Sequence, residues 1–514
     1  YGDHRDLHLS LRRQRQMCIR DSRYIDSELN LACSGFDKDR FNILLAFPDS
    51  YEIGMSHQGI RYLYHFLSRV DGVGVEFAFA PWPDLERFLR ATSEPLRSQQ
   101  TGTSVARFDL VGFSLTYELH YTNLLMMLEL SGIPLMASER DENDPLVVAG
   151  GPACTNPLPF INAIDAIFVG DAEESLVEAV EKLKALKAEG AGRAEKLSSL
   201  AEIEGVYVDG ISNGVKSRVY IFRQGDLPRR PITPVSHIVH NRLSVEVMRG
   251  CTRGCRFCHA GIFYRPRRER SVEEVSRAVI EGIKSSGWPE VSLLSLSTSD
   301  YSKLRSLLDR VSPWLSDRNV SLAMPSLRPE TVTELIVSAS GAVRRSGFTL
   351  APEAGTERLR RVINKWITDE EIIEGCRKIL DAGWQNLKLY FMIGLPTETQ
   401  EDLDGIVELV ERILLLPRTS RRFKLAVSIS PFVPKPHTPF QWERQNSVEE
   451  IREKEHYIAS RLRSRRVVLS LRDPRFSILE GILSRGDRGM WNVLLSAYLS
   501  LIHISEPTRL GMIS

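Results

Sequence analysis

The chain has 514 residues, of which 42% are hydrophobic and 26% are charged, so it is long enough for two or three folded domains. Its 67 basic and 66 acidic residues leave a formal charge of +1, which excludes a global electrostatic attraction to nucleic acid or anionic membranes. No stretch reaches the roughly 20 apolar residues of a transmembrane helix, and the first residues lack a signal-peptide layout. The sequence therefore predicts a cytoplasmic protein.

Both ends of the chain read like translated sequencing-adapter DNA. The peptides RRQRQMCIRDS at 12–22 and LSLIHISEPTR at 499–509 are what a transposon adapter and its reverse complement encode. We therefore expect residues 1–22 and 499–514 to be artefacts, and residues 23–498 to be the biological segment. Genuine disordered tails are the alternative.

Apolar runs alternate with helical patterns from residue 41 onward. The sequence predicts strands at 41–48, 73–82, 109–115, 145–152 and 163–171, and helices at 60–70, 124–131 and 174–186. This alternation predicts an α/β domain over residues 23–186, with a doubly wound, flavodoxin-like parallel sheet of about five strands. Residues 187–241, which include a Lys/Ala/Glu/Gly-rich stretch and LPRRPITP, are expected to form a linker with short strands.

A second alternating series follows from residue 242. It predicts strands at 243–250, 290–297, 320–326, 347–353, 386–396 and 424–432, and helices at 272–286, 301–315, 329–338, 369–382 and 399–415. Six such repeats predict a partial (β/α)6 barrel over residues 242–442, with its active site at the carboxyl ends of the strands. Residues 443–498 are expected to form a C-terminal helical extension.

Three cysteines lie close together in MRGCTRGCRFCHAG, directly after the first strand of this second series. Cys251, Cys255 and Cys258 have the spacing Cys-x3-Cys-x2-Cys on a glycine-containing loop. Thiolates are the usual ligands of iron-sulfur clusters, and three of them leave one iron of a cubane open for another molecule. The alternatives are a structural zinc site, for which the sequence offers no second cysteine pair, or buried apolar thiols. Cys154 and Cys376 lie far away and are expected to be core thiols.

This motif resembles that of radical S-adenosylmethionine (SAM) proteins. Residues 23–498 as a whole resemble a branch of that family with an N-terminal cobalamin-binding-type domain. The resemblance implies a [4Fe-4S] cluster whose open iron is chelated by SAM, and reductive cleavage of SAM to a 5′-deoxyadenosyl radical. It also implies an electron donor such as flavodoxin or ferredoxin as a partner.

The resemblance further implies a set of SAM-binding residues, most of them at successive strand ends. Phe257 matches an aromatic residue whose backbone lies near the adenine. The others are Ser297, Thr298, Ser299, Asp300, Ser326, Arg328, Glu353, Gly394 and Leu395. Each could instead be an ordinary packed or solvated residue. No catalytic residue is assigned, because His437 in a proline-rich loop is equally consistent with packing.

Four arginines lie within six residues in YRPRRERS, at 264–271. Guanidinium groups pair with carboxylates and phosphates, so this segment could hold an anionic substrate, the SAM carboxylate or RNA phosphates. A solvated loop is the alternative.

Cobalamin-binding domains often carry an Asp-x-His-x-x-Gly loop whose histidine coordinates the cobalt, and this chain lacks it. In FPDSYEIGMSHQG, Asp49 and His57 are too far apart to match. The resemblance still implies a cradle for the corrin and its nucleotide tail at Ser114, Thr116, Gly150, Gly151, Gly170 and Asp171. The alternative is that these residues only make strand-to-helix turns.

Three functions are consistent with these patterns. The first is a radical SAM enzyme that abstracts an unactivated hydrogen atom, with methyl transfer from cobalamin, on a substrate that the sequence does not specify. The second is RNA or ribosomal-protein modification resembling methylthiotransferases, which needs a second cysteine-ligated cluster where the N-terminal domain offers only Cys33 and Cys154. The third is a non-catalytic cluster or cobalamin sensor.

Overall fold

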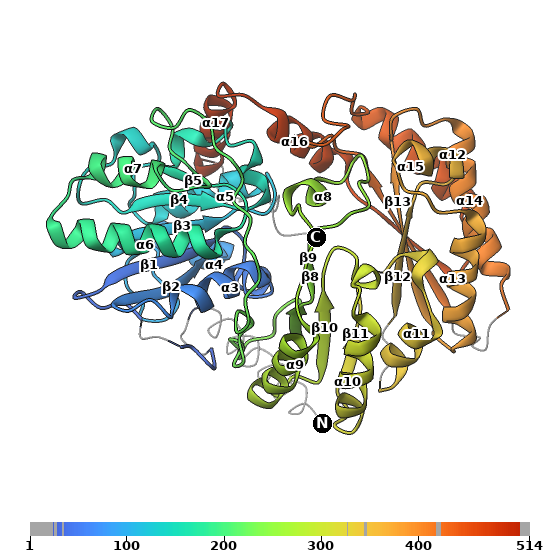
Figure 1. The fold of residues 1–514 in the computed structure, drawn as a ribbon. Coiled ribbons are helices and arrows are strands. Elements are labelled where there is room, and N and C mark those ends of the chain that lie inside the picture. The colour runs from blue at the N-terminus through green and yellow to red at the C-terminus, as the bar shows by residue number, and fades with distance from the viewer. Residues whose placement is uncertain are drawn as a thin grey trace, which may run out of the picture. The chain divides into compact units, whose positions relative to one another are not determined.

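The computed structural model describes residues 24, 28–32, 35–325, 327–343, 347–417 and 423–503. The chain divides into two compact units (Figure 1). Unit 1 comprises Tyr1–Tyr220, Arg230–Asn241 and Gly486–Ser514, and unit 2 comprises Ile221–Arg229 and Arg242–Arg485. Within the described residues, no helix is both long enough and apolar enough to span a bilayer.

Unit 1 is built on one six-stranded sheet in the order β2-β1-β3-β4-β5-β6. The strands are β1 (Phe41–Phe47), β2 (Val73–Phe79), β3 (Leu110–Ser114), β4 (Leu146–Gly150), β5 (Ala166–Phe168) and β6 (Val206–Tyr207). The first five pair in parallel, and β6 joins the edge in the antiparallel sense. This confirms the predicted doubly wound fold and adds one short edge strand.

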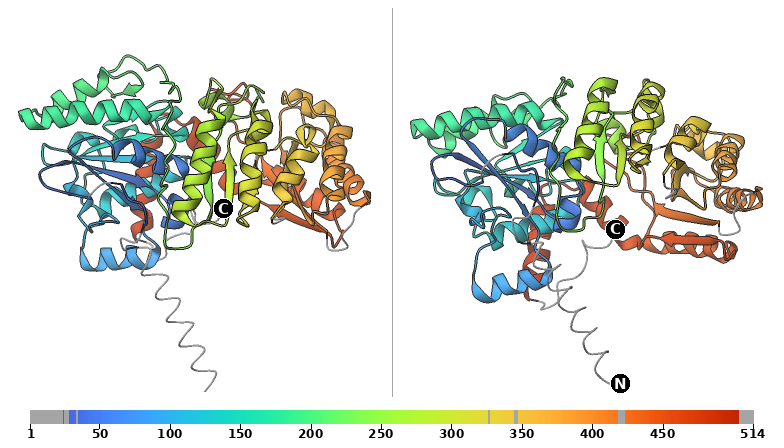
Figure 2. Two further views of the ribbon diagram at one scale, coloured as in Figure 1. Left: turned by 60° about the horizontal axis from the view of Figure 1, so that its bottom comes forward. Right: turned by 90° about the horizontal axis from the view of Figure 1, so that it is seen from below.

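Helices cover both faces of this sheet. They are α2 (Tyr51–Gly54), α3 (Gln58–Leu67), α4 (Pro83–Thr92), α5 (His120–Leu130), α6 (Ala172–Glu189), α7 (Arg193–Ala201) and α17 (Met490–His503). Helix α3 packs against α6, and α5 packs against α4 and α17. Figure 2 shows the green α6 and α7 on one side of the blue strands and the light-blue α4 on the other. Because both faces are covered, every residue of β1 and β2 is buried, which explains why their sequences are apolar except for Asn42 and Glu76.

Unit 2 contains all six strands predicted for the barrel. One parallel sheet has β7 (Leu243–Glu246), β10 (Glu290–Leu294) and β11 (Ser321–Ala323), and a second has β12 (Phe348–Glu353), β13 (Asn386–Ile393), β14 (Lys424–Pro431) and β15 (Val467–Leu471). The short strands β8 (Met248–Arg249) and β9 (Arg268–Glu269) pair in the antiparallel sense. Strand β15 was not predicted from the sequence.

The helices of unit 2 alternate with its strands. They are α8 (His259–Phe263), α9 (Val272–Ser286), α10 (Leu304–Ser316), α11 (Glu334–Gly341), α12 (Glu357–Val362), α13 (Asp369–Asp381), α14 (Gln400–Leu415), α15 (Val448–Arg461) and α16 (Pro474–Arg485). Several begin at side chains that satisfy the free N–H groups of the first turn. Helices α13, α14 and α15 each start with a capping box, in which Thr or Ser pairs reciprocally with an acidic residue three positions later.

Candidate active site

The three clustered cysteines lie on the loop between β8 and α8, and Cys258 is the residue at which α8 begins. All three are partly exposed. The Sγ atom of Cys258 accepts a hydrogen bond from the backbone N of Gly261 at 3.3 Å, and that of Cys251 accepts one from Arg253 N at 3.5 Å. Hydrogen bonds to sulfur are a normal feature of cluster ligands, so the loop fits an iron-sulfur cluster.

No three His, Cys, Asp or Glu side chains among the described residues converge closely enough to hold one metal ion. A cubane cluster takes each of its thiolates at a different iron, so the three ligands need not converge on a single point.

Gly250, directly before Cys251, fixes the path of this loop. Its φ of +81° is in the left-handed region. A Cβ atom there would lie 2.5 Å from the carbonyl oxygen of Tyr264 and 2.7 Å from that of Pro266. The cluster loop (residues 250–258, between β8 and α8) therefore packs directly against the arginine-rich segment 264–271, and only glycine fits at their contact.

Charged residues from several elements surround the cysteines. Burial raises the pKa of the Cys255 thiol, while the positive charges of Lys365 and Arg328 act to lower it. Burial also raises the pKa of Cys258, and the negative charge of Glu353 adds to that effect. Two of these neighbours, Arg328 and Glu353, are residues that the sequence analysis assigned to SAM.

Asp300 lies in the short 3-10 helix Thr298–Asp300 that follows β10. Its carboxylate accepts a two-pronged contact from the Arg253 guanidinium, with Nε at 2.9 Å, and a hydrogen bond from Ser297 Oγ at 2.7 Å. Burial acts to raise the pKa of Asp300, but these hydrogen bonds outweigh it and lower the pKa. Asp300 is therefore held as a carboxylate beside the cluster loop.

The neighbouring predicted residues are placed differently. Thr298 is fully buried, and its hydroxyl lies 3.0 Å from that of Ser295, so it supports the turn from within. Ser299 accepts a hydrogen bond from Thr331 at 2.6 Å. Arg328 forms an ion pair with Glu330. Ser326 lies outside the described residues.

A cavity of about 380 Å³ adjoins the cluster loop. It is lined by Thr252, Arg253, Arg267, Asp300, Arg328, Asn364 and Trp366. It therefore brings together the cluster loop, one arginine of the segment 264–271, and two residues predicted to bind SAM. Guanidinium groups beside a carboxylate suit a zwitterionic ligand.

Glu353 ends β12 with a φ of +71°, a conformation that residues other than glycine rarely adopt. Its carboxylate pairs with Lys365 at 3.1 Å. Such strained positions persist where the surrounding structure holds them, and they cluster at functional sites.

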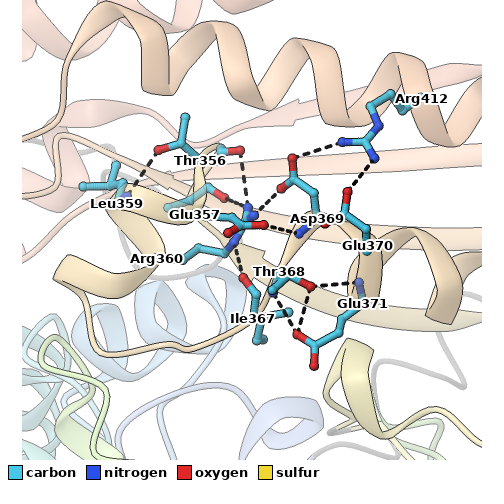
Figure 3. Close-up of polar contacts among 12 residues, drawn as sticks. Thr356, Glu357, Leu359, Arg360, Ile367, Thr368, Asp369, Glu370, Glu371 and Arg412 are labelled. Atoms are coloured by element: carbon cyan, nitrogen blue, oxygen red, sulfur yellow. Dashed lines mark hydrogen bonds and ion pairs between the residues drawn. The ribbon is translucent and has the colours of Figure 1, made fainter.

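Arg360 holds the turn that follows Glu353 (Figure 3). The side chain is fully buried, and its guanidinium donates to the carbonyl oxygens of Ala354 at 2.9 Å and Ile367 at 2.8 Å. It also forms an ion pair with Asp369 at the start of α13, which in turn pairs with Arg412. This network joins the exit of β12 to α13 and so fixes the strand end that carries Glu353.

Phe257 and Leu395, both predicted to bind SAM, belong to one apolar cluster. They pack with Ala354, Leu359, Ile363, Phe432 and Phe440. The backbone N of Gly394 donates to Glu398 at 2.9 Å. The structure therefore brings an apolar surface from β13 to the cluster loop.

Sequence reasoning missed Asn364, Lys365 and Trp366, which follow α12. Asn364 donates from Nδ2 to the carbonyl oxygens of Arg253 and Gly254, at 3.2 Å and 2.9 Å, and so fastens the cluster loop. The predicted residues were sought at strand ends, whereas these lie in the loop between α12 and α13. Their only sequence signal is the stretch RRVINKW directly after APEAGTERL.

The residues predicted for cobalamin lie at the carboxyl edge of the unit 1 sheet. Ser114 and Gly150 pair at the ends of β3 and β4, and the backbone N of Thr116 donates to His120 Nδ1 at 3.4 Å. Asp171 accepts a hydrogen bond from Tyr220 N at 2.9 Å, directly after the bridge that joins Gly170 to Arg218. Gly151 lies directly against the backbone of Leu115. Several of these residues thus have turn-forming contacts of their own.

Two family profiles match the chain, and both describe radical SAM proteins. The profile of the N-terminal domain of radical SAM proteins matches residues 59–209, and that of the radical SAM superfamily matches residues 245–410. The chain belongs to the radical SAM superfamily, and the resemblance seen in its cysteine motif is confirmed. It is a radical SAM enzyme, a class that uses a [4Fe-4S] cluster and SAM.

An uncharacterized protein of Methanocaldococcus jannaschii is 28% identical over 474 residues, covering 91% of this chain and 92% of that protein. The ribosomal protein uS12 methylthiotransferase RimO of Thermotoga petrophila is 26% identical over 183 residues, which are 33% of this chain and 41% of that enzyme. The methylthiotransferase likeness therefore concerns less than half of either protein.

Two solved structures resemble the chain over both units. One is the radical SAM methyltransferase TsrM from Kitasatospora setae with cobalamin and a [4Fe-4S] cluster bound, with a TM-score of 0.54, 15% identity, and coverage of 80% of this chain and 78% of that one. The other is the cobalamin-dependent SAM radical enzyme OxsB, with a TM-score of 0.53, 15% identity, and coverage of 82% and 56%. At these identities the likeness shows the fold.

Proposed function

We propose that this enzyme cleaves SAM reductively at a [4Fe-4S] cluster held by Cys251, Cys255 and Cys258. One observation carries the proposal. The loop that bears these thiols also contributes Arg253 to the lining of the cavity, which Asp300 and Arg328 line as well. When bound, the cluster supplies one electron to SAM, which breaks a C–S bond to give methionine and a 5′-deoxyadenosyl radical. That electron comes from a donor such as flavodoxin or ferredoxin.

The chain's own residues bind and orient SAM. Arg328 exchanges its ion pair with Glu330 for the methionine carboxylate, because the two carry opposite charges. Asp300 stays paired with Arg253 and accepts a further hydrogen bond from the ammonium group. Phe257 and Leu395 offer the adenine an apolar surface. The same apolar cluster keeps water away from a radical, which would otherwise be quenched by side reactions.

We further propose that unit 1 binds cobalamin, and that the enzyme transfers a methyl group to a substrate carbon. Support comes from the fold likeness to TsrM and OxsB, both of which bind cobalamin. When bound, cobalamin supplies the methyl group. Ligands of doubly wound sheets bind at the carboxyl edge, where Ser114, Thr116 and Gly150 lie.

This cobalamin is expected to lack a histidine ligand to cobalt. The ring of His57 packs against Phe47, with centroids 5.1 Å apart, and is folded back over its own helix at Gly59. His120 is 1% exposed and accepts a hydrogen bond from Thr116. After anaerobic reconstitution, bound cobalamin should give a base-off absorption spectrum that is the same in wild type and in His57→Ala. A histidine-coordinated spectrum that disappears in the variant would refute this binding mode.

The methylthiotransferase alternative is favoured by the partial match to RimO, and it differs in its iron content. A second cluster would need cysteine ligands in unit 1, where the described Cys154 is buried at 2% exposure. One cluster predicts about four iron atoms per reconstituted chain, and two clusters predict about eight. A value near eight would favour the methylthiotransferase.

A further inference from the structure

The order of the unit 1 strands defines one preferred ligand position. β1 lies between β2 and β3, so the connection after β1 runs to one side of the sheet and the connection after β3 runs to the other. A crevice forms at the carboxyl ends of two strands where the connections diverge in this way. Helix α3 begins beside this point after β1, and α5 begins there after β3.

Arg61, in the first turns of α3, is buried without a charged partner among the described residues. It is 5% exposed, and its Nη2 donates to Gln58 Oε1 at 2.9 Å. In the part of the chain that the structure describes, its Nε has no hydrogen-bond partner and no carboxylate lies within ion-pairing distance. Burial lowers the pKa of Arg61 to about 10. Arginine is almost never fully buried unless it is paired, so this guanidinium lacks an anion.

The start of α3 offers further donors beside this guanidinium. Gln58, which holds Arg61, is the first residue of this ten-residue helix, so the guanidinium lies at the helix start. The side chain of His57 makes no capping hydrogen bond there, and its buried Nδ1 has no partner among the described residues. Free N–H groups and the helix dipole make such an end favourable for an anion.

The carboxylates of the segments that precede α3 are engaged by other groups. Glu52 accepts a hydrogen bond from Trp82 Nε1 at 3.1 Å. Asp49 lies 3.7 Å from His120 and accepts a hydrogen bond from Ser50 N at 2.7 Å. Glu28 accepts from the hydroxyl of Tyr51 at 2.7 Å. Neutralisation of Arg61 therefore falls to a group from outside the described chain.

We infer that Arg61, His57 and the first turn of α3 form a phosphate site at the crevice between β1 and β3. A guanidinium fork and adjacent backbone N–H groups match the geometry of a phosphate better than that of a single carboxylate oxygen. The phosphate comes either from the phosphodiester of a corrinoid's nucleotide tail or from a free phosphate. The first source rests on the proposed cobalamin function, and the second does not.

The test compares cobalamin with cobinamide, a corrinoid that lacks the nucleotide tail and its phosphodiester. Binding of each is titrated by absorbance to the full-length, cluster-reconstituted protein in phosphate-free buffer. The variants are Arg61→Met, Arg61→Lys, and Arg107→Met as a control at an exposed arginine before β3. Thermal unfolding is measured for each protein with and without inorganic phosphate.

We expect wild type to bind cobalamin more tightly than cobinamide. Arg61→Met should weaken cobalamin binding about tenfold or more, as for loss of a hydrogen bond to a charged group, and leave cobinamide unchanged. The affinity of Arg61→Lys for cobalamin should lie between those of wild type and Arg61→Met, because lysine keeps the positive charge but lacks the forked guanidinium. Arg107→Met should behave as wild type. Equal binding of the two corrinoids by wild type, or an unchanged preference in Arg61→Met, would overturn the corrinoid source.

Thermal unfolding separates the remaining cases. If no corrinoid binds but inorganic phosphate raises the melting temperature of wild type and not of Arg61→Met, the phosphate site stands and the cobalamin proposal fails. If neither ligand discriminates between wild type and Arg61→Met, the inference is wrong. If Arg61 serves to bind a ligand, Arg61→Met without ligand should be at least as stable as wild type, because the substitution removes an unpaired buried charge. A purely structural arginine predicts a lower melting temperature.

Discussion

The five cysteines in the described residues divide into two kinds by their surroundings. Cys154 and Cys376 are buried, at 2% and 0% exposure, and burial alone raises the pKa of each, to about 12 for Cys376. The three motif cysteines are partly exposed and lie near charged groups. Reactive and metal-binding thiols have surroundings of the second kind.

Replacing any one of Cys251, Cys255 or Cys258 by alanine should abolish the cluster, because each is proposed to supply one of its three protein ligands. Iron and sulfide assays after anaerobic reconstitution measure this. Cys154→Ala and Cys376→Ala are the matched controls and should keep the wild-type iron content. A full cluster in any of the three single variants would contradict the assignment.

Arg360→Met should lower the free energy of unfolding by about 3 kcal/mol or more, because it leaves buried carbonyl groups without their donor and removes the buried one of the two arginines that pair with Asp369. Arg412→Met is the control, since Arg412 pairs with the same carboxylate but is 44% exposed. That exposed pair should contribute about 1 kcal/mol or less. Urea unfolding of both variants decides the point, and equal losses would refute the bracing role of Arg360.

His57 should make stability depend on pH. Burial, together with the nearby His120 and Arg61, lowers the pKa of His57 from 6.5 to about 4. Between these values the unfolded chain binds a proton that the folded chain does not. The free energy of unfolding therefore does not depend on His57 protonation above about pH 6.5, and it decreases as the pH drops toward 4. His57→Gln should reduce this slope in unfolding experiments, and an unchanged slope would contradict the lowered pKa of His57.

At the scale of elements, periodicity predicted most of the fold. The helix expected at 272–286 matches α9 at both ends, because Ser271 caps its start and Gly287, in the left-handed conformation, ends it. All predicted strands are present. β15 escaped prediction because its sequence VVLSL is mostly exposed at the edge of its sheet, so burial imposes no clear alternation on it.

The cluster loop depends on Gly250 as an element boundary. Gly250→Ala should displace the loop and lower cluster content, because its Cβ would meet two backbone oxygens within 3 Å. Gly287→Ala is the control. Gly287 also has a positive φ, but a Cβ atom there would have no contact within 4 Å among the described residues. The control should cost about 1 kcal/mol of stability and keep its cluster. Wild-type iron content in Gly250→Ala would show that the loop tolerates the change.

At the scale of the whole molecule, chain order and spatial grouping differ. Helix α17, near the end of the chain, belongs to unit 1, where Arg90 donates to Tyr498 at 3.2 Å. Their spacing alone was enough to propose the three cysteines as cluster ligands, because they share one local motif. It did not predict the roles of Asn364, Lys365 or Arg360, because these come from tertiary contacts. Asn364 donates to Gly254, which lies 110 residues earlier, Lys365 pairs with Glu353 at the end of β12, and Arg360 pairs with Asp369 in α13.

Formation of 5′-deoxyadenosine tests the central claim most directly. The cluster-reconstituted protein is incubated anaerobically with SAM and a low-potential reductant, and the nucleoside is quantified by chromatography and mass spectrometry. Wild type should form 5′-deoxyadenosine, Cys255→Ala should form none, and Cys376→Ala should match wild type. A wild-type protein with a full [4Fe-4S] cluster that yields no 5′-deoxyadenosine would contradict reductive cleavage and favour a sensor.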